Sequence, residues 1–167
     1  MFSTIISDKK EYCNFISNST FDNKVLINHK PFSCCTILNA DQTSYFPLAT
    51  LSIDNRNIKT LSNLVQFSGT LVNASNTQSA TITFRVKKCI NGTIQTISDI
   101  YPVVTPDSVA NINPISYPFD FQFCDNSNNC LCNCITYILE CNINSRRHRA
   151  VTINNAFLSV ISFIKWY

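Results

Sequence analysis

Hydrophobic and polar positions alternate along much of this chain, and that spacing predicts β-strands rather than helices. The clearest example spans residues 80–90, where apolar and polar side chains alternate from Ala80 to Lys87. Its apolar positions are Ile82, Phe84 and Val86, and its polar positions are Thr81, Thr83, Arg85 and Lys87. Because successive side chains of a strand point to opposite faces, this segment predicts a strand with one buried face.

Similar runs of strand length recur from Pro47 onward, separated by polar or proline-containing breaks. They predict strands over residues 48–54, 64–72, 116–124, 134–143 and 150–164, the last as two strands or one bent strand. Several short strands with such breaks are typical of a sandwich. We therefore expect an all-β, antiparallel β-sandwich of jelly-roll type.

Two further signals concern the connections between strands. Asn91-Gly92 lies between two β runs and favours a type I′ hairpin that returns the chain along Thr93–Ser98. Residues 101–118 contain four prolines, which lack the N–H that a sheet ladder needs. That stretch is expected to be a connection or an edge rather than a central strand.

The first 33 residues differ from the rest because their apolar residues are sparse, and only Lys24–Asn28 resembles a strand. This strand could add to the open edge of a neighbouring subunit, or it could be an edge strand of its own domain. We predict an extended N-terminal connector arm over residues 1–33 and a jelly-roll-like β-sandwich domain over residues 34–167.

Composition supports a folded domain and disfavours several partners. Apolar residues make up 45% of the chain and charged residues only 14%, with a net charge of +3. So weak a charge predicts neither a nucleic acid nor an anionic membrane as partner. The longest apolar run, residues 156–164, is too short to cross a bilayer, and the first ten residues do not resemble a secretory signal.

Nine cysteines are the main chemical signal of the sequence. Because nine is odd, at least one thiol must be free, metal-bound or linked to another molecule. Adjacent cysteines seldom bond each other, so Cys34 and Cys35 are each expected to reach a different partner. We predict disulfide or cross-linking roles for Cys13, Cys34, Cys35, Cys89, Cys124, Cys130, Cys132, Cys134 and Cys141.

A metal or redox site is the alternative role for part of this set. In an extended segment Cys130, Cys132 and Cys134 would line one surface, and thiolates bind zinc. Closed zinc sites usually show paired Cys-x-x-Cys motifs or histidines, however, and this chain has only His29 and His148. We therefore predict no metal and no other cofactor, and retain a zinc-binding or redox module as the alternative function.

Enzymatic chemistry finds little support in the sequence. A nucleophilic site would need a histidine base, but His29 lies in the predicted arm and His148 lies in the basic run 146–149, which is typical of a solvated loop. Acidic residues occur singly, and Glu140 is best explained as an outward strand residue. We predict no catalytic or cofactor-binding residues.

The motifs of the chain resemble an uncharacterised cysteine-rich domain family of spore-forming clostridia. The resemblance covers about residues 34–164 and rests on residues 48–54, 84–92, 119–125, 130–134 and 137–140. One departure is that the family often carries a further cysteine after Asp54, where this chain has Asn55-Arg56-Asn57. The segment before Pro31 is also longer than is usual in that family.

That family is more loosely similar to jelly-roll subunits of endospore appendages, in which an N-terminal connector with cysteines cross-links neighbouring subunits. The resemblance implies assembly inside the mother cell and display on the spore surface without a secretory signal, which would explain many cysteines in a chain that has no export signal. Copies of the chain itself are then the expected partners, in a head-to-tail homopolymer that other spore-surface proteins could join.

The sequence therefore predicts a non-enzymatic structural subunit that forms a disulfide-cross-linked fibre. Head-to-tail contacts that do not close into a ring generate filaments, and disulfides between the arm and a neighbour would keep them from dissociating. Besides the zinc or redox module, a soluble surface-binding domain that does not assemble is a third possibility.

Overall fold

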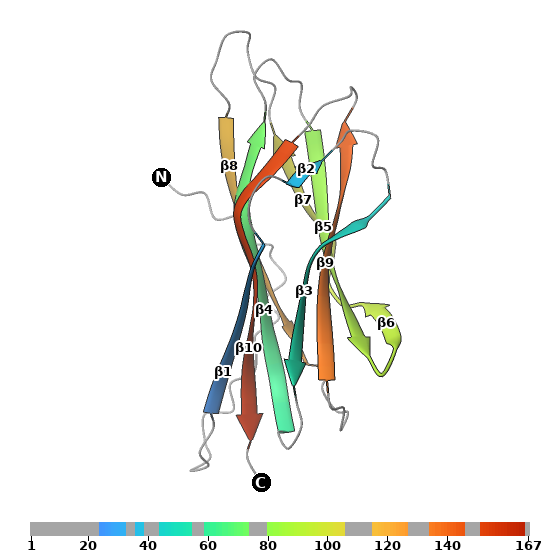
Figure 1. The fold of residues 1–167 in the computed structure, drawn as a ribbon, viewed down its shortest axis with the longest axis vertical. Helices are drawn as coiled ribbons and strands as arrows, with labels where there is room; N and C mark the ends of the chain where they lie inside the picture. Colours follow the sequence, from blue (N-terminus) through green and yellow to red (C-terminus); the bar gives the residue numbers. More distant parts are fainter. Residues whose placement is uncertain are drawn as a thin grey trace.

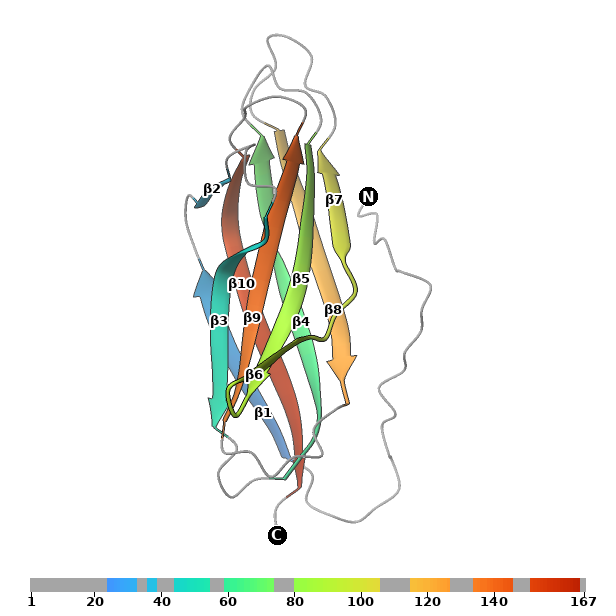
Figure 2. The same ribbon diagram turned by 90° about the vertical axis from the view of Figure 1, so that its right-hand side faces the viewer.

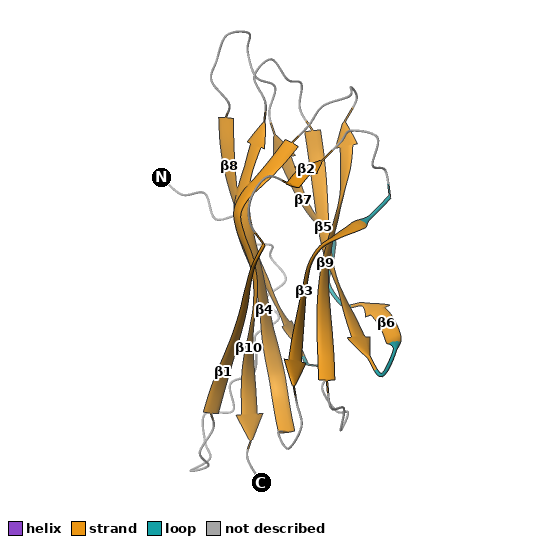
Figure 3. Ribbon diagram, viewed as in Figure 1, coloured by secondary structure: helices purple, strands orange, loops and turns teal. Residues whose placement is uncertain are grey.

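The computed structural model describes residues 24–32, 36–38, 44–54, 59–73, 80–105, 115–126, 134–145 and 151–165. In these ranges the regular structure consists of strands, so no helix there could cross a membrane (Figure 3). The strands are β1 (Lys24–Phe32), β2 (Thr36–Leu38), β3 (Phe46–Asp54), β4 (Lys59–Asn73), β5 (Ala80–Ile90), β6 (Thr93–Thr96), β7 (Tyr101–Thr105), β8 (Ile115–Asp125), β9 (Cys134–Ser145) and β10 (Val151–Lys165).

Two antiparallel sheets pack face to face (Figures 1 and 2). The first sheet has the order β1-β10-β4-β8, with β2 also paired to β10, and the second has the order β3-β9-β5-β6, with β7 also paired to β5. If the short strands β2 and β6 are set aside, strands from both halves of the sequence alternate across each sheet, which is the arrangement of a jelly roll. The predicted fold class is confirmed.

Most predicted strands are confirmed, and their inner faces match the alternation. Ile82, Phe84 and Val86 of β5 are all fully buried. The turn after β5 has the positive φ angles that a type I′ hairpin needs, 49° at Asn91 and 80° at Gly92. The predicted segment 150–164 is one strand, β10, with a register shift between Asn154 and Phe157.

Where the structure describes it, the proline-rich stretch 101–118 consists of edge strands, in agreement with the prediction. It contains β7, which pairs with β5, and also the first residues of β8, which pairs with β4 over eleven positions. Both strands are edges within the described sheets, and Pro118 lies inside β8 opposite Thr70. Proline is compatible with an edge strand, because one side of that strand makes no ladder hydrogen bonds.

The boundary predicted at residue 33 needs correction. β1 pairs with β10 of the same chain at nine consecutive positions, from Lys24 opposite Ile164 to Phe32 opposite Ala156. The segment that resembled a strand is therefore an edge strand of the domain, which was the second of the two possibilities left open. The rest of the predicted arm, residues 1–23, lies outside the described residues.

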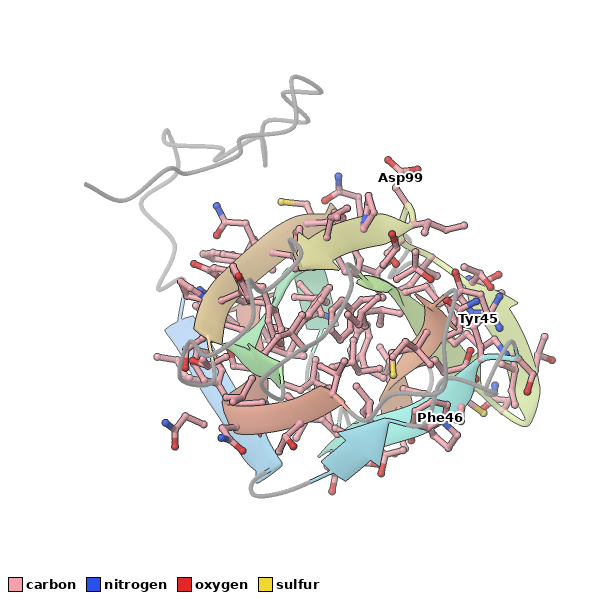
Figure 4. The ribbon with its side chains drawn as sticks, turned by 90° about the horizontal axis from the view of Figure 1, so that it is seen from above. Tyr45, Phe46 and Asp99 are labelled. Atoms are coloured by element: carbon pink, nitrogen blue, oxygen red, sulfur yellow. The ribbon has the colours of Figure 1, made fainter. Side chains whose placement is uncertain are left out.

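Aromatic side chains form the centre of the core between the two sheets (Figure 4). Phe84 of β5 stacks on Phe119 of β8, with ring centroids 4.7 Å apart. The ring centroids of Phe67 of β4 and Phe121 of β8 are 5.3 Å apart. Tyr101 meets the ring of Phe121 at 4.8 Å. The contacts of Phe84 and Tyr101 join the two sheets, whereas Phe67 and Phe121 are neighbours within the first sheet. Aromatic pairs of this kind contribute about 0.5–1.5 kcal/mol beyond their burial.

A glycine accommodates the bulge of β10 against this core. A Cβ atom added at Gly69 would lie 2.8 Å from Cβ of Ala156 and 2.9 Å from Cζ of Phe119. Ala156 falls within the register shift of β10, where Asn155 has a φ of 48°. The bulge thus brings β10 so close to β4 that only a residue without a side chain fits.

Replacing Gly69 by alanine should destabilise the domain by about 1–3 kcal/mol, since the added methyl group must displace Ala156 or the Phe119 ring. Urea unfolding followed by tryptophan fluorescence measures the change. Asn155→Gly is the matched control at the same bulge, because glycine adopts a positive φ without strain. Equal stability of Gly69→Ala and the wild type would contradict the tight packing.

Candidate cross-linking site

Three of the cysteines lie at one end of the sandwich, called here the cysteine end. Cys89 is the penultimate residue of β5, Cys124 is the penultimate residue of β8, and Cys134 is the first residue of β9. β5 and β8 finish where β9 starts, at the lower end of Figures 1 and 2. The topology therefore gathers cysteines from the ends of three strands.

Cys89 and Cys134 share the outer face of their sheet. Cys89 pairs in register with Thr136, two residues from Cys134, which makes the two cysteines diagonal neighbours. Both are free thiols, with Cys134 exposed and Cys89 half-buried. A pair of free thiols on an outer face is available to a partner from outside the domain.

Cys124 lies on the outer face of the other sheet and is disulfide-bonded. Its neighbours across that sheet are apolar, because the register places Cys124 opposite Leu64, Leu64 opposite Ile161, and Ile161 opposite Ile27. The side chain of Ile27, on the edge strand β1, is 66% exposed. An apolar row thus crosses the outer face of this sheet beside the cysteine end.

Cys141 does not belong with these residues, although the sequence assigned it a cross-linking role. It is a free thiol buried in the core, and burial, followed by the nearby charge of Glu140, raises its pKa to about 12. A protonated and inaccessible thiol is a poor partner for disulfide exchange. In this fold Cys141 is a packing residue.

The remaining predicted residues Cys13, Cys34, Cys35, Cys130, Cys132 and His148 lie outside the described residues. His29 is part of β1, opposite Ser159 of β10. Within the described ranges, no three His, Cys, Asp or Glu side chains gather as a metal site would require. The zinc alternative depended on Cys130 and Cys132, so it stays untested.

A buried polar cluster that the sequence pattern did not predict lies inside the cysteine end. Nζ of Lys88 lies 2.6 Å from Oδ2 of Asp125, Tyr137 donates its hydroxyl proton to the same oxygen at 2.7 Å, and Nδ2 of Asn63 donates to the Tyr137 hydroxyl at 2.6 Å. All four residues are buried. One signal was present in the sequence, because Lys88 continues the buried face of β5 that Ile82 begins.

This cluster fixes the positions of two cysteines. Lys88 precedes Cys89 on β5 and Asp125 follows Cys124 on β8, and neighbouring strand residues point to opposite faces. The inward ion pair therefore holds together the two strand ends that present these cysteines outward. Removing one partner of so buried a pair typically costs about 3–5 kcal/mol.

A second polar cluster covers the outer face of β5 and β9. Glu140 accepts a hydrogen bond from Nε of Arg85 at 2.8 Å and one from Nζ of Lys87 at 3.0 Å, and the Arg85 guanidinium lies 3.7 Å from the ring centroid of Tyr45. Figure 4 shows Tyr45 outside the core, near the rim. Glu140 therefore points outward, as predicted, but its neighbours cover it almost completely.

These contacts lower the pKa of Glu140. Burial alone would raise it, but the hydrogen bonds and charges of Lys87 and Arg85 together outweigh burial and hold the pKa below the ordinary value of 4.5. The ionised carboxylate is thus the form that the fold stabilises.

The described free thiols should differ sharply in reactivity. In native protein at about pH 8 we expect iodoacetamide to modify Cys134 first and Cys89 more slowly, because thiolate character and access control the reaction. Cys141 should react only after unfolding, and raising the pH to about 10 should not change this, since its pKa is about 12. Peptide mass spectrometry measures the extents. Fast modification of Cys141 in native protein would contradict its burial.

Glu140→Gln should destabilise the domain by about 1–2 kcal/mol at neutral pH, because two charge-assisted hydrogen bonds are weakened. A lowered folded-state pKa contributes stability above the unfolded value, and this contribution is lost as the pH falls through the folded value. The difference between variant and wild type should therefore vanish in acid. Urea unfolding across a pH series measures it, with Asp99→Asn, an exposed carboxylate, as control. A difference that persists in acid would show that packing, not charge, is responsible.

Comparison with solved structures finds virus particles with a similar fold. The T=1 particles derived from infectious bursal virus match with a TM-score of 0.54 and 11% identity over 83% of this chain and 31% of theirs. The T13 particle of the same virus matches with a TM-score of 0.53 and 12% identity over 82% of this chain and 31% of its own. The chain spans about a third of the length of these structures, and the likeness shows a shared fold.

These neighbours are virus particles rather than the endospore appendages that the looser resemblance implied. Among curated proteins, none matches the chain. At the level of families, residues 28–162 match the domain of unknown function DUF4489, in agreement with the expected uncharacterised family. This match covers most of the sandwich, from β1 to β10, and the chain therefore belongs to the DUF4489 family.

Proposed function

We propose that this chain is a non-enzymatic structural subunit that assembles with copies of itself into a fibre, in which β1 of one subunit pairs with β10 of the next and disulfides then lock the contact. We further propose that the fibre is an appendage of the spore surface. The observation that carries the proposal is the position of β1 at the edge of its sheet, where β10 is its ladder partner.

An edge strand of this kind is well suited to exchange between subunits. The nine-position ladder between β1 and β10 has the same hydrogen bonds whether both strands belong to one chain or to two. Exchange of an identical element is therefore a low-cost route to association. If each subunit gives its strand to one neighbour and accepts a strand from another, the contact repeats from subunit to subunit without closing.

The chemistry of the cysteine end supports the second half of the proposal. β1 begins at this end, as Figure 1 shows, so the chain before Lys24 joins the domain at the same end of the sandwich that holds Cys89 and Cys134. Both are free thiols on an outer face, as an intermolecular disulfide requires. Such bonds would form once the assembly meets an oxidising environment outside the cell.

The likeness to virus particles supports the structural role in general terms only. Those proteins build particles, and the shared sandwich is a fold whose function depends on its surface residues. The spore location derives from the resemblance noted in the sequence.

Strand exchange can be trapped by a disulfide placed across the ladder. His29 and Ser159 are register partners, and Cα atoms across an antiparallel pair lie about 4.5–5.5 Å apart, which suits a disulfide. His29→Cys protein and Ser159→Cys protein, labelled with different isotopes, are unfolded, mixed and refolded under oxidising conditions. A disulfide that joins the two isotopes at positions 29 and 159 is the expected result in peptide mass spectrometry.

The matched control pairs His29→Cys with Thr152→Cys, which lies on the same strand but opposite Ile37 of β2. That pair should form no such bond. If the mixed disulfide is equally rare in both mixtures, β1 pairs only within its own chain and the proposed exchange is wrong.

A further inference from the structure

We propose that Lys88 and Asp125 condense to an amide, so that an isopeptide bond joins the two sheets at the cysteine end. The pair has the features that such a reaction needs: an amine and a carboxyl group in direct contact, shielded from water, with a hydroxyl donor on the carboxyl oxygen. The proposal does not rest on assembly, because the bond would lie within one chain.

The amine of Lys88 lies close to the carboxyl group of Asp125 that it would attack. Nζ of Lys88 lies 2.6 Å from Oδ2 of Asp125, which is one bond from the carboxyl carbon, and reacting atoms in enzymes lie about 3–3.5 Å apart. Lys88 projects from β5 and Asp125 from β8, and these strands belong to different sheets. The contact is held in place by the packing of both sheets rather than by a flexible loop.

Burial separates this pair from an ordinary surface ion pair. The side chain of Lys88 is 0% exposed and that of Asp125 is 2% exposed. Two buried ions lose their hydration, whereas an amide has no net charge and is much cheaper to bury. Condensation therefore relieves a cost that the ion pair imposes on the folded domain, and the absence of bulk water opposes hydrolysis of the product.

The same domain contains a natural contrast. Lys87, the neighbour of Lys88, contacts Glu140 at 3.0 Å, but its side chain is 26% exposed and Arg85 shares the same carboxylate. There the Lys87 ammonium stays partly hydrated, and the second cation stabilises the carboxylate charge. We expect no condensation at this pair, which makes it an internal control.

The reaction balances without any added reagent. A proton passes from Nζ to the carboxyl group, and the nitrogen lone pair then attacks Cγ of Asp125 to form a tetrahedral intermediate. Loss of the carboxyl oxygen with two protons releases one water and leaves the Nζ–Cγ amide, which keeps a single N–H. Neither an oxidant nor a reductant takes part.

Tyr137 is the group that assists departure of the oxygen. Its hydroxyl donates to Oδ2 at 2.7 Å, where it stabilises the negative charge of the intermediate and can supply a proton to the leaving oxygen. Asn63 is a positioning residue, because its Nδ2 donates to the Tyr137 oxygen and so directs the tyrosine proton toward Asp125.

Mass spectrometry of the full-length wild-type protein, reduced and alkylated, tests the proposal directly. The expected mass is that of the sequence minus one water, and proteolysis should yield a branched peptide that joins Lys88 to Asp125. An unbranched map in which both residues are unmodified would overturn the proposal. A branched peptide between Lys88 and Asn63, formed with loss of ammonia, would also overturn it, since the acyl group would then be the wrong one.

Variants separate the roles of the residues. Lys88→Arg keeps a cation that cannot form this amide, so the measured mass of this variant should equal the mass calculated from its own sequence. The control Lys87→Arg should still be one water lighter than the mass calculated from its sequence. Tyr137→Phe should slow the appearance of the branched peptide in freshly translated protein by about 100-fold. If Lys88→Arg still loses water, Lys88 is not the nucleophile. If the branched peptide appears at an unchanged rate in Tyr137→Phe, Tyr137 does not assist the reaction.

Discussion

Contact between the inner faces of the two sheets is the interaction on which the rest of this structure depends. Each long strand presents one face to the core, and the rings of Phe84 and Phe119 stack across the gap between the sheets. This packing brings strand ends from distant parts of the sequence to one end of the molecule. The cysteines and the buried polar cluster meet there because the aromatic centre fixes how the sheets lie over each other.

The buried Lys88–Asp125 pair gives that end of the sandwich a particular chemistry. An apolar pair would join the sheets at lower cost, because two buried charges lose their hydration. The charged pair instead places a nucleophile, a carboxyl group and a hydroxyl donor in one dry site. The outward neighbours on the same strands are Cys89 and Cys124. The ends of β5 and β8 therefore position both the buried ion pair and the outward cysteines.

The edge strands determine how the domain could meet its own copies. β1 is the edge strand of its sheet, and the apolar row from Ile27 to Cys124 crosses the outer face of the same sheet. A fibre built by exchange of β1 would leave the aromatic core of each subunit unchanged. Stability of the domain and assembly of the fibre would therefore depend on different sets of residues.

The sequence by itself determined the fold class and most of the strands, because alternation of apolar and polar side chains is a local property. It identified the buried face of β5 and the Asn91-Gly92 hairpin, since both depend on a few neighbouring residues. It also showed that an odd number of cysteines cannot all pair internally.

The tertiary structure decided which residues meet. Only the pairing of β1 with β10 assigned residues 24–32 to the sandwich, because the alternation of side chains in a strand does not indicate which strand it pairs with. Cys141 became a core residue while Cys134 became exposed, although both belong to β9, since Cys141 faces the first sheet and Cys134 lies at a strand end. Lys88 and Asp125 are 37 residues apart, and only the packing of two sheets places their charged groups in contact.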